Sequence, residues 1–74
     1  MLVEVRLFAS FREGRFKNKQ LELPDEGSLG NLLEYLDIPE EQAAILLVNG
    51  KDTSVDRKLA PGDVVSIFPA IGGG

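Results

Sequence analysis

The 74-residue sequence contains no cysteine and no histidine, and each absence argues against a class of function. Without cysteine the chain can form neither a disulfide nor a thiolate metal site, so its stability must come from packing. The two absences also remove the side chains that most often serve as nucleophile and general base. The acids Glu4, Glu22, Asp25 and Glu26 lack the spacing of a metal motif. We therefore expect no metal site and no catalysis by the chain's own side chains.

Long apolar runs and an excess of positive charge are also missing. No run approaches the length of a membrane span, and the N-terminus lacks a basic region followed by a long apolar stretch, which predicts a cytoplasmic protein that is not exported. The formal net charge of −4 and the pI near 4.6 oppose nucleic-acid binding, because contact with phosphates requires a basic surface. The basic cluster Arg12, Arg15, Lys17 and Lys19 falls in a turn-like stretch, and we interpret it as a solvated loop.

The first third of the chain has the alternating pattern of two strands. Residues 1–9 alternate, so we expect one set of side chains to face the core, namely Val3, Val5, Leu7 and Ala9. Phe8 falls on the opposite, mostly polar side. Residues 20–23 alternate again before Pro24, which predicts a hairpin with a loose polar connection.

A single amphipathic helix is predicted after this hairpin. Ser28 is a good N-cap, and Pro39 disfavours helical geometry at the preceding residue, so the helix should end near Asp37. Four leucines form one apolar stripe at helical spacing: Leu29, Leu32, Leu33 and Leu36. Residues 39–42 have the composition of one further short turn.

The second half of the chain predicts three more strand segments. Residues 44–48 are a continuous apolar run before Asn49-Gly50, typical of a strand buried on both faces, or nearly so, and we expect it at the centre of the sheet. Residues 51–58 are polar enough to form only a short edge segment and a loop. Pro61 and Gly62 occupy the central positions of a type II turn, and residues 64–68 form the last strand, whose hydrogen bonding Pro69 should end.

This order of elements predicts an α+β protein with a β-grasp (ubiquitin-like) fold. We expect a mixed four- to five-stranded sheet, covered on one face by one main helix, with the first and last strands parallel at its centre. Residues 1–69 form the predicted domain. Residues 70–74 form a flexible C-terminal glycine tail, because successive glycines offer nothing to a core and lose much entropy on ordering.

Several short motifs, taken together, resemble a known family. They are Leu7-Phe8-Ala9 followed by Arg12-Glu13, the turn Val48-Asn49-Gly50, the segment Leu59-x-x-Gly62-Asp63-x-Val65-x-Ile67-Phe68-Pro69, and the terminal Gly73-Gly74. In this order they resemble the small ubiquitin-like sulfur carriers of the MoaD/ThiS family over nearly the whole chain. Gly72 departs from the pattern, since family members usually have a larger residue before the diglycine.

The resemblance implies that Gly74 is the reactive position. In the family an E1-like adenylyltransferase uses ATP to activate the terminal carboxylate, and a sulfurtransferase or other persulfide donor supplies sulfur. The resulting thiocarboxylate donates sulfur to a biosynthetic intermediate. Gly72, Gly73 and Gly74 would thread into the partner, and the carrier itself would bind no cofactor.

The resemblance also implies a partner interface at Phe8, Arg12, Phe68 and Pro69. The residues alone leave two alternatives open, which are core packing for the two phenylalanines and a solvated loop charge for Arg12. An exposed aromatic pair rimmed by charge is what a docking patch requires.

Among the family's pathways, we predict molybdopterin (molybdenum or tungsten cofactor) biosynthesis. The segments Leu7-Phe8-Ala9, Arg12-Glu13 and Phe68-Pro69 look closer to that branch, in which a large synthase subunit is the partner. The near alternative is thiamine thiazole synthesis with a thiazole synthase. Two other classes are a ubiquitin-like modifier conjugated through Gly74 and a β-grasp binding module whose tail is inert.

Overall fold

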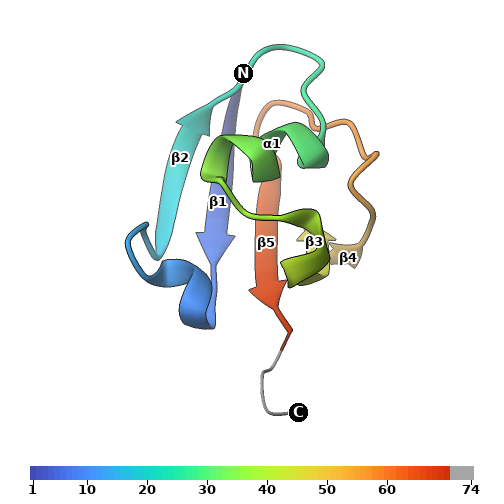
Figure 1. Cartoon of the computed structure of the whole chain (residues 1–74). Helices are drawn as coiled ribbons and strands as arrows, with labels where there is room; N and C mark the ends of the chain where they lie inside the picture. Colours follow the sequence, from blue (N-terminus) through green and yellow to red (C-terminus); the bar gives the residue numbers. More distant parts are fainter. Residues whose placement is uncertain (71–74) are drawn as a thin grey trace.

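A five-stranded sheet and one α-helix make up the computed structural model, which describes residues 1–70 (Figure 1). The strands lie in the order β2-β1-β5-β3-β4 across the sheet. Their bounds, with those of helix α1 and the 3-10 helices η1 and η2, are β1 Leu2–Leu7, η1 Ala9–Arg12, β2 Asn18–Glu22, α1 Leu29–Leu36, η2 Glu40–Gln42, β3 Ala43–Val48, β4 Lys51–Asp52 and β5 Val64–Pro69.

The centre of the sheet is a parallel pair formed by the first and last strands. β1 and β5 pair in register from Glu4 opposite Val64 to Leu7 opposite Ile67. β2 pairs antiparallel with the outer side of β1, and β3 pairs antiparallel with the outer side of β5. This is the predicted β-grasp arrangement, and the expected central pairing is confirmed.

Helix α1 begins and ends where local sequence rules place it. The Ser28 hydroxyl accepts a hydrogen bond from the Asn31 amide at 3.2 Å, and the Asn31 side chain accepts one from the Ser28 amide at 2.9 Å. The helix ends at Asp37, which has a left-handed φ of 60°. The four leucines of the predicted stripe are all buried against the sheet. Within residues 1–70, no helix is long and apolar enough to cross a membrane.

The end of β1 differs from the prediction. Val3, Val5 and Leu7 are buried as expected, but Ala9 is exposed, with a φ of 52°. The strand stops at Leu7, so its alternation does not continue to Ala9, and the chain turns into η1. Phe11, which the sequence analysis left in a polar connection, is buried instead.

The interpretation of the basic cluster as a solvated loop is wrong for Arg15, which makes hydrogen bonds to the backbone. Its guanidinium donates to the carbonyl oxygens of Leu36 at 3.0 Å and Asp37 at 3.2 Å, and to that of Phe11 at 3.3 Å. Carbonyls at the end of a helix lack intrahelical donors. Arg15 therefore stabilises the end of α1 and ties it to the loop after β1.

Strand β3 is neither central nor buried on both faces, so both parts of that prediction are wrong. It lies between β5 and the two-residue edge strand β4. Leu46 and Val48 are buried, whereas Ala44 is exposed and Ile45 is 48% exposed. The physical reason is that α1, the only α-helix among residues 1–70, covers one face of the sheet (Figure 1). An irregularity in the β3–β5 register falls between Ala43 and Ile45.

The two predicted turns have the expected backbone geometry. Asn49 and Gly50 both have positive φ, 54° and 83°, as a tight turn between β3 and β4 requires. Gly62 has a φ of 85°, and the Asp63 amide donates to the Ala60 carbonyl at 3.1 Å. Strand β5 ends at Pro69 as predicted, but it includes the proline, which lies opposite Ala43, and is therefore one residue longer than the expected strand 64–68.

Asp63 joins these turns to the start of β5. It is the only buried charged residue in the part of the chain that the structure describes, with 7% of its surface exposed. Its carboxylate accepts hydrogen bonds from the Ala60 amide at 2.8 Å and from the Asn49 side-chain nitrogen at 3.0 Å. The Asn49 side-chain oxygen in turn accepts from the Val64 amide at 2.9 Å. The Gly62-Asp63 and Asn49-Gly50 motifs thus form one hydrogen-bonded unit.

Replacing Asp63 by alanine should lower the free energy of unfolding by about 2 kcal/mol, because the substitution leaves two partly buried donors without their charged acceptor. Urea unfolding followed by circular dichroism measures the change. Asp56→Ala is the matched control at an exposed aspartate and should stay within about 0.5 kcal/mol of the wild type. A loss for Asp63→Ala no larger than that of the control would show that this unit does not stabilise the fold.

Candidate functional site

The sheet face turned away from α1 carries the candidate site. On β5, Val65 and Ile67 point into the core and are fully buried, so the alternating residue Phe68 points to the uncovered face. Ile45 of β3 lies directly opposite Phe68 in the ladder and therefore shares this face. Residues from different strands thus come together where no helix covers the sheet.

Two phenylalanines form the centre of this face. The rings of Phe8 and Phe68 stack with centroids 4.1 Å apart and planes at 9°. Both residues are half-buried, so neither is a core residue and neither is fully exposed. Together with Ile45 they form an apolar surface, which we call the Phe8 patch: Phe8, Ile45 and Phe68. The sequence analysis brought the two phenylalanines together but missed Ile45, which it placed in a strand buried on both sides.

Arg12 lies at the rim of the Phe8 patch, with its guanidinium carbon 5.1 Å from the centre of the Phe8 ring. Its Nε donates a hydrogen bond to the Leu7 carbonyl at 2.6 Å. A guanidinium over an aromatic face is an attractive arrangement that also holds the side chain in place. Arg12 is exposed, but these contacts make it a positioned charge rather than a free loop side chain.

The turn after β1 sets the position of both Phe8 and Arg12. The Phe11 amide donates to the Phe8 carbonyl at 3.1 Å, and the buried Phe11 side chain anchors η1 in the core. Ala9 begins this turn with a φ of 52°, a left-handed conformation that costs a residue with a Cβ atom more than it costs glycine. The backbone at Ala9 is therefore strained next to the Phe8 patch.

A shallow hollow of about 460 Å³ lies beside Phe8 and is rimmed by positive charge. Arg6, Arg12 and Lys17 line it together with Asn18. Arg6 also pairs with Glu4, at 2.7 Å from its carboxylate. Arg6 was not among the predicted site residues, although the alternation of β1 puts it on the same face as Phe8 and could have identified it. One edge of the Phe8 patch is therefore basic in a chain that is acidic overall.

Pro69 follows Phe68 at the end of β5 and is half-buried. The structure thus brings all four predicted interface residues to one end of the sheet: Phe8, Arg12, Phe68 and Pro69. The exposed Ala70 comes next and is the last residue described. The predicted roles of Gly72, Gly73 and Gly74, and most of the predicted flexible tail, lie outside the described residues and stay predictions.

The site offers aromatic and aliphatic surface with guanidinium groups, a combination enriched at protein interfaces. Within residues 1–70, no three acidic side chains gather as potential metal ligands.

Comparison with known proteins identifies the family. The sequence matches the model of the ThiS family over residues 5–74. The chain belongs to the ThiS family. This assignment confirms the resemblance drawn from the sequence motifs, and the chain is a ubiquitin-like protein of the sulfur-carrier type.

Solved structures of similar proteins agree with this ThiS-family assignment. A protein described as molybdopterin converting factor, subunit 1, from Pyrococcus furiosus is 31% identical with a TM-score of 0.78, over 96% of this chain and 99% of that one. Subunit 1 in a complex of subunits 1 and 2 of molybdopterin-converting factor from Helicobacter pylori is 26% identical with a TM-score of 0.66, over the full length of both chains.

A third structure shows the same fold at lower identity. Small archaeal modifier protein 1 from H. volcanii is 21% identical with a TM-score of 0.76, over 95% of this chain and 98% of that one. No curated protein matches the sequence.

A glycine substitution at Ala9 tests whether the backbone of the turn beside the Phe8 patch is strained. Ala9→Gly should raise the free energy of unfolding by about 0.5 to 1 kcal/mol, because glycine adopts positive φ without the Cβ clash. Thermal unfolding measures the gain. Ala44→Gly is the matched control at an exposed alanine without positive φ, and should instead lower stability. Equal losses for both variants would contradict a strained turn at Ala9.

Proposed function

We propose that this ThiS-family protein carries sulfur on the carboxyl group of Gly74 for molybdopterin biosynthesis. The observation that carries the proposal is the parallel pairing of β1 with β5, which brings the Phe8 patch beside the start of the glycine tail. A partner that docks on the Phe8 patch is then close to the segment that leads to Gly74. The family match supports sulfur carriage, and the P. furiosus and H. pylori structures support the molybdopterin pathway.

The reaction must first make the terminal carboxylate electrophilic. A C-terminal carboxyl group has a reference pKa of about 3.3 to 3.7, so at neutral pH it is an anion and a poor acyl electrophile. In the activating partner, a carboxylate oxygen attacks the α-phosphorus of ATP and pyrophosphate leaves. The resulting acyl-adenylate has lost the carboxylate charge and holds AMP as a leaving group.

Sulfur then enters from a persulfide held by a sulfurtransferase or another donor. The terminal persulfide sulfur attacks the acyl carbon, and AMP leaves. A thiol next attacks the other sulfur of the acyl persulfide, which forms a disulfide on the donor side and releases the thiocarboxylate. The carrier contributes only its carboxyl group to these steps, which accords with a sequence that lacks cysteine and histidine.

The Phe8 patch, Arg12 and Pro69 form the proposed docking surface for two successive partners. These are an E1-like adenylyltransferase and the large subunit of a synthase. The H. pylori structure, a complex of two subunits, supports the second partner. Stacked aromatics beside an arginine have the composition of an energetic hot spot, and the basic hollow next to them suits an acidic edge on the partner.

Sulfur transfer for thiamine thiazole synthesis is the second candidate, because the matching family model is that of ThiS. The two candidates share every step up to the thiocarboxylate. They differ in the acceptor, which is a large synthase subunit in one case and a thiazole synthase in the other. Transfer of labelled sulfur from the loaded carrier to each purified acceptor separates them.

Intact mass spectrometry should show the proposed modification directly. After incubation with the activating enzyme, ATP and a persulfide donor, a fraction of the chain should carry one sulfur in place of one oxygen. Deletion of Gly73 and Gly74 should abolish this fraction, because the new terminus no longer reaches the adenylation site. The control Leu2→Ala changes an exposed side chain at the far end of β1 and should load normally. Normal loading of the truncated chain, or isopeptide-linked lysine conjugates in place of the thiocarboxylate, would contradict the proposal.

Substitutions in the Phe8 patch should slow activation without unfolding the domain. We expect Phe8→Ala and Phe68→Ala each to lower kcat/KM for adenylation at least about tenfold, as hot-spot aromatics do. ATP–pyrophosphate exchange measures the rate, and thermal unfolding checks that the variants are folded. Leu2→Ala again serves as the control and should stay within about twofold. Wild-type exchange by both folded phenylalanine variants would rule out docking on this patch.

A further inference from the structure

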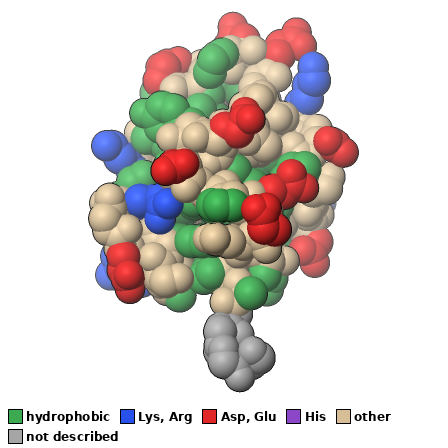
Figure 2. Space-filling model, viewed as in Figure 1, with side chains coloured by type: hydrophobic (Ala, Val, Ile, Leu, Met, Phe, Trp, Pro, Cys, Tyr) green, Lys and Arg blue, Asp and Glu red, His purple; other side chains and the backbone are tan. Residues whose placement is uncertain are grey.

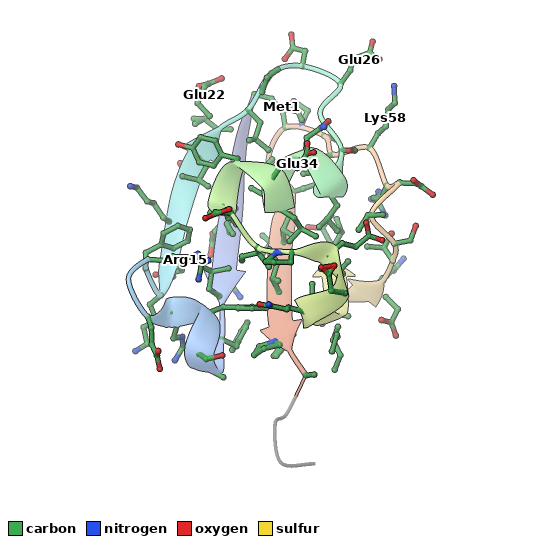
Figure 3. The ribbon with its side chains drawn as sticks, viewed as in Figure 1. Met1, Arg15, Glu22, Glu26, Glu34 and Lys58 are labelled. Carbon is green, nitrogen blue, oxygen red and sulfur yellow. The ribbon has the colours of Figure 1, made fainter. Side chains whose placement is uncertain are left out.

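A second concave surface lies on the helix side of the molecule. It is a groove of about 770 Å³ between α1 and the turn that follows β2. We call it the Tyr35 groove, and it is lined by residues 22–27 with Asn31, Glu34 and Tyr35. Figure 3 shows Glu22, Glu26 and Glu34 around it, near the end of the sheet where Met1 lies. The Phe8 patch is on the opposite face of the sheet and at its other end (Figure 1).

Tyr35 is the feature that the fold itself does not explain. It is 66% exposed, more than Leu2 or Ile45, the other exposed large hydrophobic residues in the described part of the chain. The four leucines of α1 already provide the buried stripe that packs the helix. A lone exposed aromatic residue is common on protein surfaces, but this one borders a groove with mostly apolar walls. Tyrosine in such a position is a frequent anchor for a partner.

The rim of the Tyr35 groove is negatively charged, and Figure 2 shows many acidic side chains on this helix side of the molecule. Its carboxylates are those of Glu22, Asp25, Glu26 and Glu34. The N-terminal ammonium group of Met1 lies 2.7 Å from Glu22 and 3.5 Å from Asp25, and its pKa is raised, chiefly by the hydrogen bond to Glu22. Lys58 pairs with Glu26 at 3.0 Å. Glu34 has no ion-pair partner within residues 1–70, so the rim keeps an excess of negative charge.

The wall formed by residues 22–27 is held by backbone hydrogen bonds. The Leu23 amide donates to the Met1 carbonyl at 2.8 Å, and the Gly27 carbonyl accepts from Leu59 at 2.9 Å. The Gly27 amide donates to Pro24 at 3.1 Å, and a Cβ atom at Gly27 would lie only 3.1 Å from that same carbonyl oxygen. The groove is therefore part of the folded domain and does not require a partner in order to form.

We propose that the Tyr35 groove docks a segment of a partner protein in which arginine or lysine residues flank an aliphatic side chain. The aliphatic group lies in the groove beside the exposed ring of Pro24. A guanidinium or ammonium group lies over the Tyr35 ring, within reach of Glu34. Charge complementarity identifies this occupant, because the rim carries four carboxylates and, within residues 1–70, only the Met1 ammonium group and Lys58 form ion pairs with them. Docking here leaves the Phe8 patch free, so the inference does not depend on the proposed function.

Nuclear magnetic resonance titration of the full chain with short blocked peptides tests this surface. The probe is Arg-Arg-Leu-Arg-Arg, and the matched peptides are Arg-Arg-Ser-Arg-Arg, without the aliphatic group, and Glu-Glu-Leu-Glu-Glu, with reversed charge. The leucine peptide should shift the amide signals of Gly27, Asn31 and Tyr35. The serine peptide should bind about tenfold more weakly, since the aliphatic contact is lost, and the glutamate peptide should not bind.

Variants of the chain locate the binding. Tyr35→Ala should weaken the leucine peptide about tenfold, whereas Tyr35→Phe, which keeps the ring, and Leu2→Ala, outside the groove, should leave its Kd within about twofold. The amide spectra of the free variants establish that each is folded. The proposal is overturned if the leucine peptide does not bind, if its shifts fall on the Phe8 patch, if the serine peptide binds equally well, or if Tyr35→Ala binds normally.

Discussion

The parallel pairing of β1 and β5 at the centre of the sheet is the constraint on which the rest of this molecule depends. Because the two strands run in the same direction, the residue after β1 and the end of β5 meet at one end of the sheet, where Phe8 stacks on Phe68. The chain continues from that end towards its terminal glycines. In the proposed function the reactive group is the chain's own terminus, so a recognition surface is needed close to where the tail begins, and the central strand pair places the Phe8 patch there.

A single helix creates the second constraint, because it can cover only one face of a five-stranded sheet. The covered face holds the packed leucines, valines and isoleucines, and the other face must leave apolar side chains partly in water. A domain of this size is only marginally stable. Stacking of Phe8 on Phe68 and the guanidinium of Arg12 over Phe8 limit the exposed aromatic area while a surface for partners remains.

Local rules in the sequence predicted most of the fold, and long-range contacts account for what they missed. The cap at Ser28, the leucine stripe and the turns at Asn49-Gly50 and Pro61-Gly62 depend on neighbouring residues, and all were confirmed. The apolar run of β3 was misjudged because composition does not reveal how many faces of a strand are covered. The contacts of Arg15 with the end of α1 join residues 21 and 22 positions apart, which no local pattern encodes. At the candidate site, alternation and family resemblance found Phe8 and Phe68, but Ile45 required the sheet register.

The separation of the Phe8 patch from the Tyr35 groove bears on how a carrier passes between partners. Partners that act on the same terminus in turn compete for the surface beside it, so each must leave before the next can bind. A groove on the other face and at the other end of the sheet is free of this competition. Its acidic rim also differs in charge from the basic edge of the patch, so the partners proposed for the two surfaces differ in charge. In the proposed arrangement, a segment bound in the groove keeps the carrier near its enzymes while the tail is released from one enzyme and enters the next. Such tethering raises the effective concentration of the tail at the second enzyme.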